Sequence, residues 1–112
     1  MAPSGELQPN ELAAIDTYFD GDRDFYLVFR NASVEQFVVD IKTGDDACAA
    51  GDTATLRRTA HSLKSVLLTL GHAEHSACAK AVELAAQQPP WEQAVAGWAD
   101  LRQRIVQSFG LA

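Results

Sequence analysis

Residues 53–70, TATLRRTAHSLKSVLLTL, decide the fold of this chain. Their apolar side chains recur at the spacing of an α-helix, and no window of the sequence alternates like a half-buried strand. Asp52 stands where a helix N-cap is expected, and Gly71 stands where a helix ends. The predicted inward stripe is formed by Leu56, Ala60, Leu63, Leu67 and Leu70. The stretch therefore predicts an amphipathic helix that buries one face against other helices.

The same periodicity predicts four more helices, over residues 11–20, 23–50, 73–88 and 90–109. Five helices joined by short breaks predict an all-α fold, an antiparallel four-helix bundle with a short additional N-terminal helix. Residues 1–8 show no periodicity and are predicted to be a flexible leader. Residues 9–112 are then one domain, which matches the length of the chain.

Several helix positions carry specific expectations. Asn10 is the expected N-cap of the first helix, whose inward stripe would be Leu12, Ile15 and Phe19. The helix at 23–50 shows two apolar stripes that do not align, so we expect a kink or a change of packing partner near 31–33. The first stripe is Phe25, Val28, Phe29 and Ala32, and the second is Val34, Phe37, Val38, Ile41 and Cys48. Gly44 falls where the second stripe needs an apolar residue, and it weakens the helix by about 1 kcal/mol relative to Ala. The fourth helix is expected to bury His75, Cys78, Ala79, Val82 and Ala86, and the fifth Ala94, Trp98, Leu101, Ile105 and Phe109.

Composition limits the classes of function. The net charge of -6 argues against nucleic-acid binding, which needs a basic face. No apolar run approaches the roughly 20 residues that cross a bilayer, so no direct membrane contact is expected. The first eight residues lack the features of a signal peptide, and two cysteines do not make a disulfide framework. These features predict a cytoplasmic protein, and we expect a monomer.

His61 stands among cations on the central helix. Arg57, Arg58, Lys64 and Ser65 lie three or four residues from it and are its surface neighbours. His61 is turned about 100° or more from the inward stripe, so its imidazole should reach water. A neutral imidazole is a nucleophile, and the nearby cations could balance the charge of a phosphoryl group. Spacing alone, however, is more typical of a solvated helix face than of a site.

A family resemblance changes that reading. The string AHSLKS at 60–65, followed by LG at 70–71, resembles the signature of histidine-containing phosphotransfer (HPt) domains, Ala-His-x-Leu-Lys-Gly followed by Leu-Gly. The likeness extends to FY at 25–26, to AAGD at 49–52 and to Glu83, which matches an acidic position in the family's next helix.

The resemblance implies a mechanism. His61 would accept a phosphoryl group through Nε2 from an aspartate of a receiver domain and pass it to another receiver. Lys64 would be its charge partner, with Arg57, Arg58 and Ser65 as further contacts. The chain would be a phosphocarrier rather than an enzyme and would need no cofactor, because Mg²⁺ is expected on the partner. The implied partners are a response-regulator receiver domain, a hybrid sensor kinase, or both. The domain could also be the cytoplasmic C-terminal part of a membrane-bound hybrid kinase.

The sequence departs from the family at two places. Ser65 replaces the usual glycine beside the histidine, which would narrow the choice of partner, while its hydroxyl could bond the phosphoryl group or His61. His75 and Cys78 stand where the family favours larger aliphatic residues.

Three alternatives stay open at this stage. The chain could be an HPt-like docking protein that binds a receiver or an enzyme without phosphotransfer. His72, His75 and Cys78 have helical spacing that could hold a metal, although a structural zinc normally needs four ligands, so we expect no metal site. Leu68 lies on the face of His61 and would be a docking contact for a receiver, unless the short first helix covers it together with Val66.

Overall fold

The computed structural model describes residues 7–111 of the chain. Most of the predicted leader, residues 1–6, lies outside the described residues, as does residue 112. The described part contains five helices and no strand, which confirms the all-α prediction. The helices are α1 (Pro9–Tyr18), α2 (Arg23–Ala50), α3 (Thr53–Thr69), α4 (Ala73–Ala85) and α5 (Trp91–Phe109).

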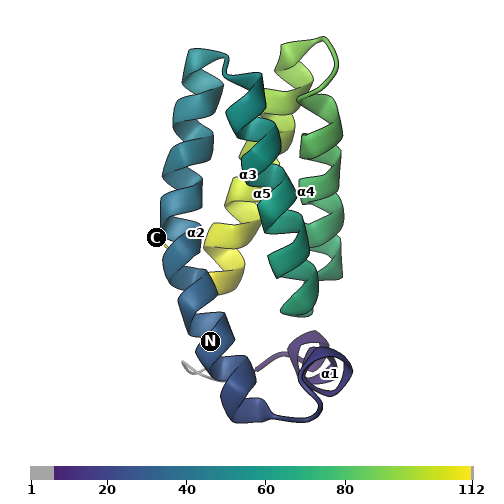
Figure 1. The fold of residues 1–112 in the computed structure, drawn as a ribbon. Helices are drawn as coiled ribbons and strands as arrows, with labels where there is room; N and C mark the ends of the chain where they lie inside the picture. Colours follow the sequence, from purple (N-terminus) through teal and green to yellow (C-terminus); the bar gives the residue numbers. More distant parts are fainter. Residues whose placement is uncertain (1–6, 112) are drawn as a thin grey trace.

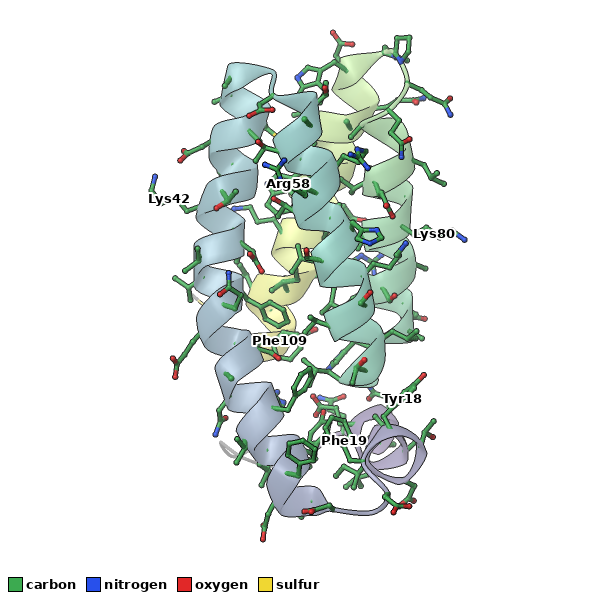
Figure 2. All side chains as sticks on the ribbon, in the orientation of Figure 1. Tyr18, Phe19, Lys42, Arg58, Lys80 and Phe109 are labelled. Carbon is green, nitrogen blue, oxygen red and sulfur yellow. The ribbon has the colours of Figure 1, made fainter. Side chains whose placement is uncertain are left out.

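The four longer helices lie side by side, and successive helices run in opposite directions (Figure 1). Helix α3 packs between α2 and α4, and α5 contacts both α4 and α2. The short helix α1 lies across one end, near the start of α2 and the end of α3 (Figure 1). The buried apolar side chains form a single cluster, which includes Phe19 of the α1–α2 connection. Partly buried Phe109, at the end of α5, packs against this cluster (Figure 2).

Helix α3 follows its predicted stripe. Leu56, Ala60, Leu63, Leu67 and Leu70 are all buried. Asp52 caps the helix, because its carboxylate accepts a hydrogen bond from the backbone N–H of Thr55 at 3.1 Å. Gly71 ends it with a φ of 98°, a left-handed conformation that glycine adopts without steric cost. These contacts fix the rotation of α3 and therefore the side on which His61 lies.

Helix α2 differs from the prediction. It is one unbroken helix, and its buried residues form a single stripe: Tyr26, Ser33, Phe37, Gly44 and Ala47. Phe25, Val28 and Val38 were expected inside but are more than half exposed. Hydropathy misplaced the stripe because small and polar residues occupy two of its turns. The packing partner does change along the helix: Tyr26 stacks edge-on against Phe19, and Phe37 packs against Phe109.

Gly44 has a packing reason that hydropathy could not show. A Cβ atom built there would stand 2.0 Å from the Trp98 ring of α5, so only glycine permits this approach. The indole Nε1 then donates to the Asp45 carboxylate at 2.9 Å. Gly44 therefore lets α5 come close to α2, whatever it costs in helix propensity.

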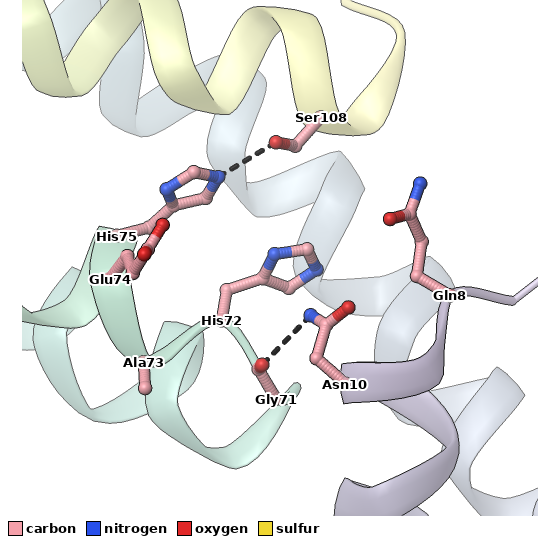
Figure 3. Close-up of a pocket in the computed structure, with 8 residues that line it drawn as sticks. All are labelled: Gln8, Asn10, Gly71, His72, Ala73, Glu74, His75 and Ser108. Carbon is pink, nitrogen blue, oxygen red and sulfur yellow. Dashed lines mark hydrogen bonds between the residues drawn. The ribbon is translucent and has the colours of Figure 1, made fainter.

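Helix α1 is the second correction. It begins at Pro9, with Gln8 as its N-cap, so Asn10 lies inside the first turn. The Asn10 side chain instead donates to the carbonyl of Gly71 at 2.8 Å (Figure 3). Leu12, expected inside, is exposed, while Glu11 is buried. Ile15 and Phe19 are buried as predicted, so the packed face differs from the prediction only because it includes Glu11 and Ala14 and leaves out Leu12.

A hydrogen-bonded ion cluster explains the buried Glu11. Its carboxylate accepts from the guanidinium of Arg30 at 3.1 Å and from Nε2 of His72 at 2.9 Å. It also accepts from the backbone N–H of Gln8 at 3.0 Å. Burial raises the pKa of Glu11, but these hydrogen bonds and the charge of Arg30 outweigh it and lower the pKa to about 2. The cluster ties α1 to α2 and to the turn between α3 and α4.

The remaining helices differ from expectation mainly at their ends. Helix α4 ends at Ala85 rather than Gln88, and α5 begins at Trp91 rather than Pro90. His75, Cys78 and Phe109 are only partly buried. Ser76 takes the inward position in α4, where its hydroxyl donates to the carbonyl of Lys64 at 2.8 Å.

Candidate functional site

His61 projects from the exposed side of α3. Its side chain is 60% exposed, which confirms the expectation that the imidazole reaches water. The exposure follows from the fixed rotation of α3, since Ala60 and Leu63 beside it in sequence are buried. The ring is therefore accessible to a macromolecular partner.

One ring nitrogen of His61 is held by Glu83 of α4. Nδ1 lies 2.7 Å from Oε2 of Glu83. An ionised carboxylate only accepts hydrogen bonds, so Nδ1 carries the proton of this bond. In a neutral ring, Nε2 then keeps its lone pair and is the nucleophilic atom. Glu83 thus sets both the orientation of the ring and its tautomer.

The same carboxylate also binds Lys64. The ammonium of Lys64 donates to Oε1 of Glu83 at 2.9 Å, and its side chain is 29% exposed. The hydrogen bond from Lys64, followed by that from His61, lowers the pKa of Glu83. Lys64 therefore lies beside His61, as the spacing predicted, but the two meet through Glu83 rather than directly.

Packing between α3 and α4 holds this arrangement in register. Ser76 bonds the backbone of Lys64, and seven residues later Glu83 reaches His61 and Lys64. Seven residues are two helical turns, so Ser76 and Glu83 share one face of α4. Between them, Ala79 and Val82 are buried. The helix contact places Glu83 opposite His61 without help from a loop.

The other expected contact residues are exposed around this cluster. Arg57, Arg58 and Ser65 are exposed, and among the described residues none of them bonds His61. Arg58 makes one long hydrogen bond, 3.4 Å, to the hydroxyl of Thr55. Leu68 is 43% exposed, so α1 does not cover it, while Val66 is partly buried.

The three residues considered as metal ligands bond different partners. His72 bonds Glu11, His75 bonds the hydroxyl of Ser108 at 2.7 Å (Figure 3), and Cys78 lies 3.5 Å from the Asp100 carboxylate. Within residues 7–111, no three His, Cys, Asp or Glu side chains gather closely enough to hold a metal ion. The rings of His72 and His75 stack, with centroids 5.1 Å apart.

Glu83 is the site residue whose role the sequence did not assign. In the sequence, Glu83 is recognisable only as an acidic position that matches the HPt pattern. Its distance of 22 residues from His61 gives no local signal, because the contact depends on how α4 packs on α3.

One protein-family model matches this chain. The model described as Hpt domain matches residues 9–108, nearly the whole chain. The chain belongs to the Hpt domain family. Hpt domains are phosphocarriers with a histidine phosphotransfer role in two-component systems, and they interact with receiver domains and sensor kinases. Neither the curated proteins nor the solved structures gave a match to this Hpt domain.

Proposed function

We propose that the chain accepts a phosphoryl group on Nε2 of His61 from the aspartyl phosphate of one receiver domain and passes it to another. The observation that carries this proposal is the bond between Nδ1 of His61 and Glu83. In the neutral ring it places the proton on Nδ1 and the lone pair on exposed Nε2, which is what an attacking nucleophile requires.

The transfer can be written with its charges balanced. The lone pair of Nε2 attacks phosphorus, the Nε2–P bond forms, and the P–O bond to the aspartate breaks to release its carboxylate. The phosphorylated ring keeps its proton on Nδ1 and gains positive charge, which the Glu83 carboxylate stabilises. The reverse steps deliver the group to a second receiver. Mg²⁺ belongs to the receiver, and the carrier contributes position and electrostatics and needs no cofactor of its own.

Lys64 is the proposed charge partner of the phosphoryl group. Its flexible side chain can turn from Glu83 toward a phosphoryl group on the neighbouring ring. Arg57, Arg58 and Ser65 border the same exposed face, and we propose them as contacts to the phosphoryl group or the receiver. Leu68 supplies exposed apolar surface on that face and is proposed to contact the receiver as well.

The remaining proposals concern the whole chain. We propose one phosphotransfer domain over residues 9–112 that acts as a monomeric carrier in the cytoplasm; Leu7 and Gln8, predicted to belong to the leader, pack with this domain. It would serve as a free protein or as part of a hybrid sensor kinase. The four neighbouring long helices support an antiparallel four-helix bundle. No helix within residues 7–111 combines the length and hydropathy needed to span a bilayer.

Phosphotransfer from a panel of receiver domains tests this function. Each receiver is phosphorylated with radiolabelled acetyl phosphate and mixed with the wild-type chain, His61→Gln or the matched control His75→Gln. We expect acid-labile, alkali-stable label on the wild type and on His75→Gln, and none on His61→Gln.

Two outcomes would count against the carrier. Equal label on His61→Gln would move the acceptor elsewhere. Stable binding of a receiver without any label would favour the docking protein, which Ser65 in place of glycine supports.

A further inference from the structure

The cations of this acidic chain are unevenly paired. Five of the nine Lys and Arg side chains form ion pairs with carboxylates: Arg30, Lys42, Lys64, Arg102 and Arg104. The other four form none within residues 7–111. Three of these four, Arg57, Arg58 and Lys80, belong to the two helices that build the His61 site.

Two of these side chains are helix-surface neighbours of His61, and the third belongs to the helix packed against α3. Arg57 and Arg58 precede His61 by one helical turn on α3. Lys80 precedes Glu83 by three residues on α4, between Ser76 and Glu83, which both bond α3. Figure 2 shows Arg58 on the α2 side of α3 and Lys80 extending from α4 on the other side. All three are exposed. We call Arg57, Arg58 and Lys80 the cationic patch.

Glu83 makes the cationic patch important. The Glu83 carboxylate pairs with Lys64 and bonds His61, so the charge of Lys64 is neutralised and gives the approach to His61 no net positive field. Helix α3 contains no Asp or Glu, and Asp52 at its N-cap is the acidic group at that end. Asp40 of α2 lines a groove with Ser62, so it adds a third carboxylate to Glu83 and Asp52 near His61. Arg57, Arg58, Lys64 and Lys80 therefore outnumber the neighbouring carboxylates in a chain whose net charge is -6.

The connection between α1 and α2 has the opposite charge. Asp20 and Asp22 of the connection, Asp16 in the last turns of α1 and Asp24 in the first turn of α2 are exposed. They form no ion pair among the described residues, and Arg23 is the local cation. The molecule thus has an excess of cations near His61 and a group of carboxylates where α1 meets the start of α2, which lies at one end of the bundle (Figure 1). Such a separation of charge orients a protein in the field of an oppositely charged partner.

We propose that Arg57, Arg58 and Lys80 guide an acidic receiver surface onto His61, so that the two arginines contact the receiver rather than the phosphoryl group and act on the rate of association more than on the transfer step. This inference rests on the proposed function. Exposed charges contribute little to the stability of a complex, but they raise association rates and make them depend on salt. Lys80 is the diagnostic residue, because it lies outside the helix that carries His61.

The first measurement maps the potential without any receiver. Amide-proton relaxation of the wild-type chain is measured with an anionic and with a cationic nitroxide in solution. We expect the anionic probe to relax residues 57–61 and Lys80 more strongly than the cationic probe, and the reverse at 16–24. Equal relaxation by the two probes around His61 would overturn the proposal.

The second measurement uses a phosphorylated receiver that labels the wild-type chain. Its second-order transfer rate is followed from 20 mM to 500 mM NaCl with Arg57→Gln/Arg58→Gln/Lys80→Gln and with the control Arg23→Gln. We expect the triple variant to be about tenfold slower at ~20 mM salt and within about twofold of wild type at ~500 mM, where charges are screened. The single variant Lys80→Gln should lose part of the rate, and Arg23→Gln should lose none.

The outcomes separate the two proposals. Transfer at an unchanged rate and salt dependence in the triple variant would refute guidance and leave the carrier intact. A slower rate that persists at ~500 mM salt would also refute guidance, because it would place these residues in the transfer step. Failure of every receiver to label the wild type would refute the carrier, and guidance onto it, even where the nitroxides report a positive face.

Discussion

Two clusters in this protein use the same three kinds of side chain for different purposes. In each, one glutamate binds a histidine and a longer cation: Glu83 with His61 and Lys64, and Glu11 with His72 and Arg30. The first histidine is 60% exposed and the second only 10%. The two clusters differ in exposure and in the choice of ring nitrogen rather than in residue types, and these differences separate the proposed acceptor site from a structural one.

The ring nitrogens differ between the clusters. His61 uses Nδ1 for its carboxylate and leaves Nε2, the outer nitrogen, free for a partner. His72 uses Nε2 for Glu11, and its ring packs against Phe109 and His75. Its remaining nitrogen lies next to the side-chain stem, where a phosphoryl donor has little access. His72 therefore holds α1 in place, while His61 meets the geometric requirements of the proposed acceptor.

Replacing each histidine by glutamine should give the largest difference between the two clusters, in phosphoryl label and in stability. His61→Gln is expected to lose all phosphoryl label while its free energy of unfolding stays close to that of wild type, because the side chain is exposed. His72→Gln should keep the label and lose stability. Labelling by a phosphorylated receiver and urea unfolding of both variants check this, and a His72→Gln variant that folds but takes no label would break the comparison.

Removing the two glutamates should separate the clusters by stability. Glu11→Ala leaves Arg30 and His72 without their carboxylate, which costs about 3 to 5 kcal/mol when a buried pair loses one partner. Glu83→Ala, the matched control, should cost much less because its partners reach solvent. Urea denaturation curves of the two variants measure the difference, and equal losses would show that the Glu11 cluster is not a buried anchor.

Low pH should destabilise the folded protein by protonating Glu11 in the buried cluster. The folded pKa of Glu11, about 2, lies below the ordinary value of 4.5, so the folded state favours the ionised form. Its contribution is present above about pH 4.5 and is lost as the pH falls toward 2; the shift corresponds to about 3 kcal/mol. Unfolding free energies measured from pH 6 to pH 2 should show this loss in the wild type. Glu11→Gln should flatten the curve, and an unchanged slope in that variant would assign the acid sensitivity to other carboxylates.

The smallest expected effect is on the orientation of His61. Glu83→Ala frees the ring and removes the bond that selects its tautomer, so we expect transfer at saturating receiver to slow by about 10- to 100-fold. Glu83→Gln should recover part of the rate, because its amide oxygen can still accept from Nδ1. Nitrogen NMR of the imidazole reports the tautomer directly, and an unchanged tautomer ratio in Glu83→Ala would remove Glu83 from its orienting role.

The accuracy of the sequence predictions varied with what each helix packs against. Helix α3 could be predicted because its buried face is apolar apart from Thr59, and its rotation alone exposes His61. Helix α2 could not, because Ser33 and Gly44 lie in its buried stripe while Val28 and Val38 face solvent. Hydropathy describes the preference of a single side chain for water or for the core. The absence of a side chain at Gly44, in contrast, is required by the Trp98 ring of α5, which packs against that position.

The candidate site divides in the same way. The motif and its spacing identified His61, placed Lys64 one turn away and put Leu68 on the exposed face. They could not show that Lys64 is held by Glu83, or that Asn10 and Glu11 anchor α1 to the turn at Gly71 and His72.

The sequence by itself determined the all-helical fold, the family and the exposed histidine, because these depend on periodicity and on neighbours within one helix. Only the tertiary structure decided which nitrogen of that histidine is free and which cations remain unpaired around it. Those properties depend on Glu83, 22 residues away, and a carboxylate at that separation meets His61 only when α4 packs against α3.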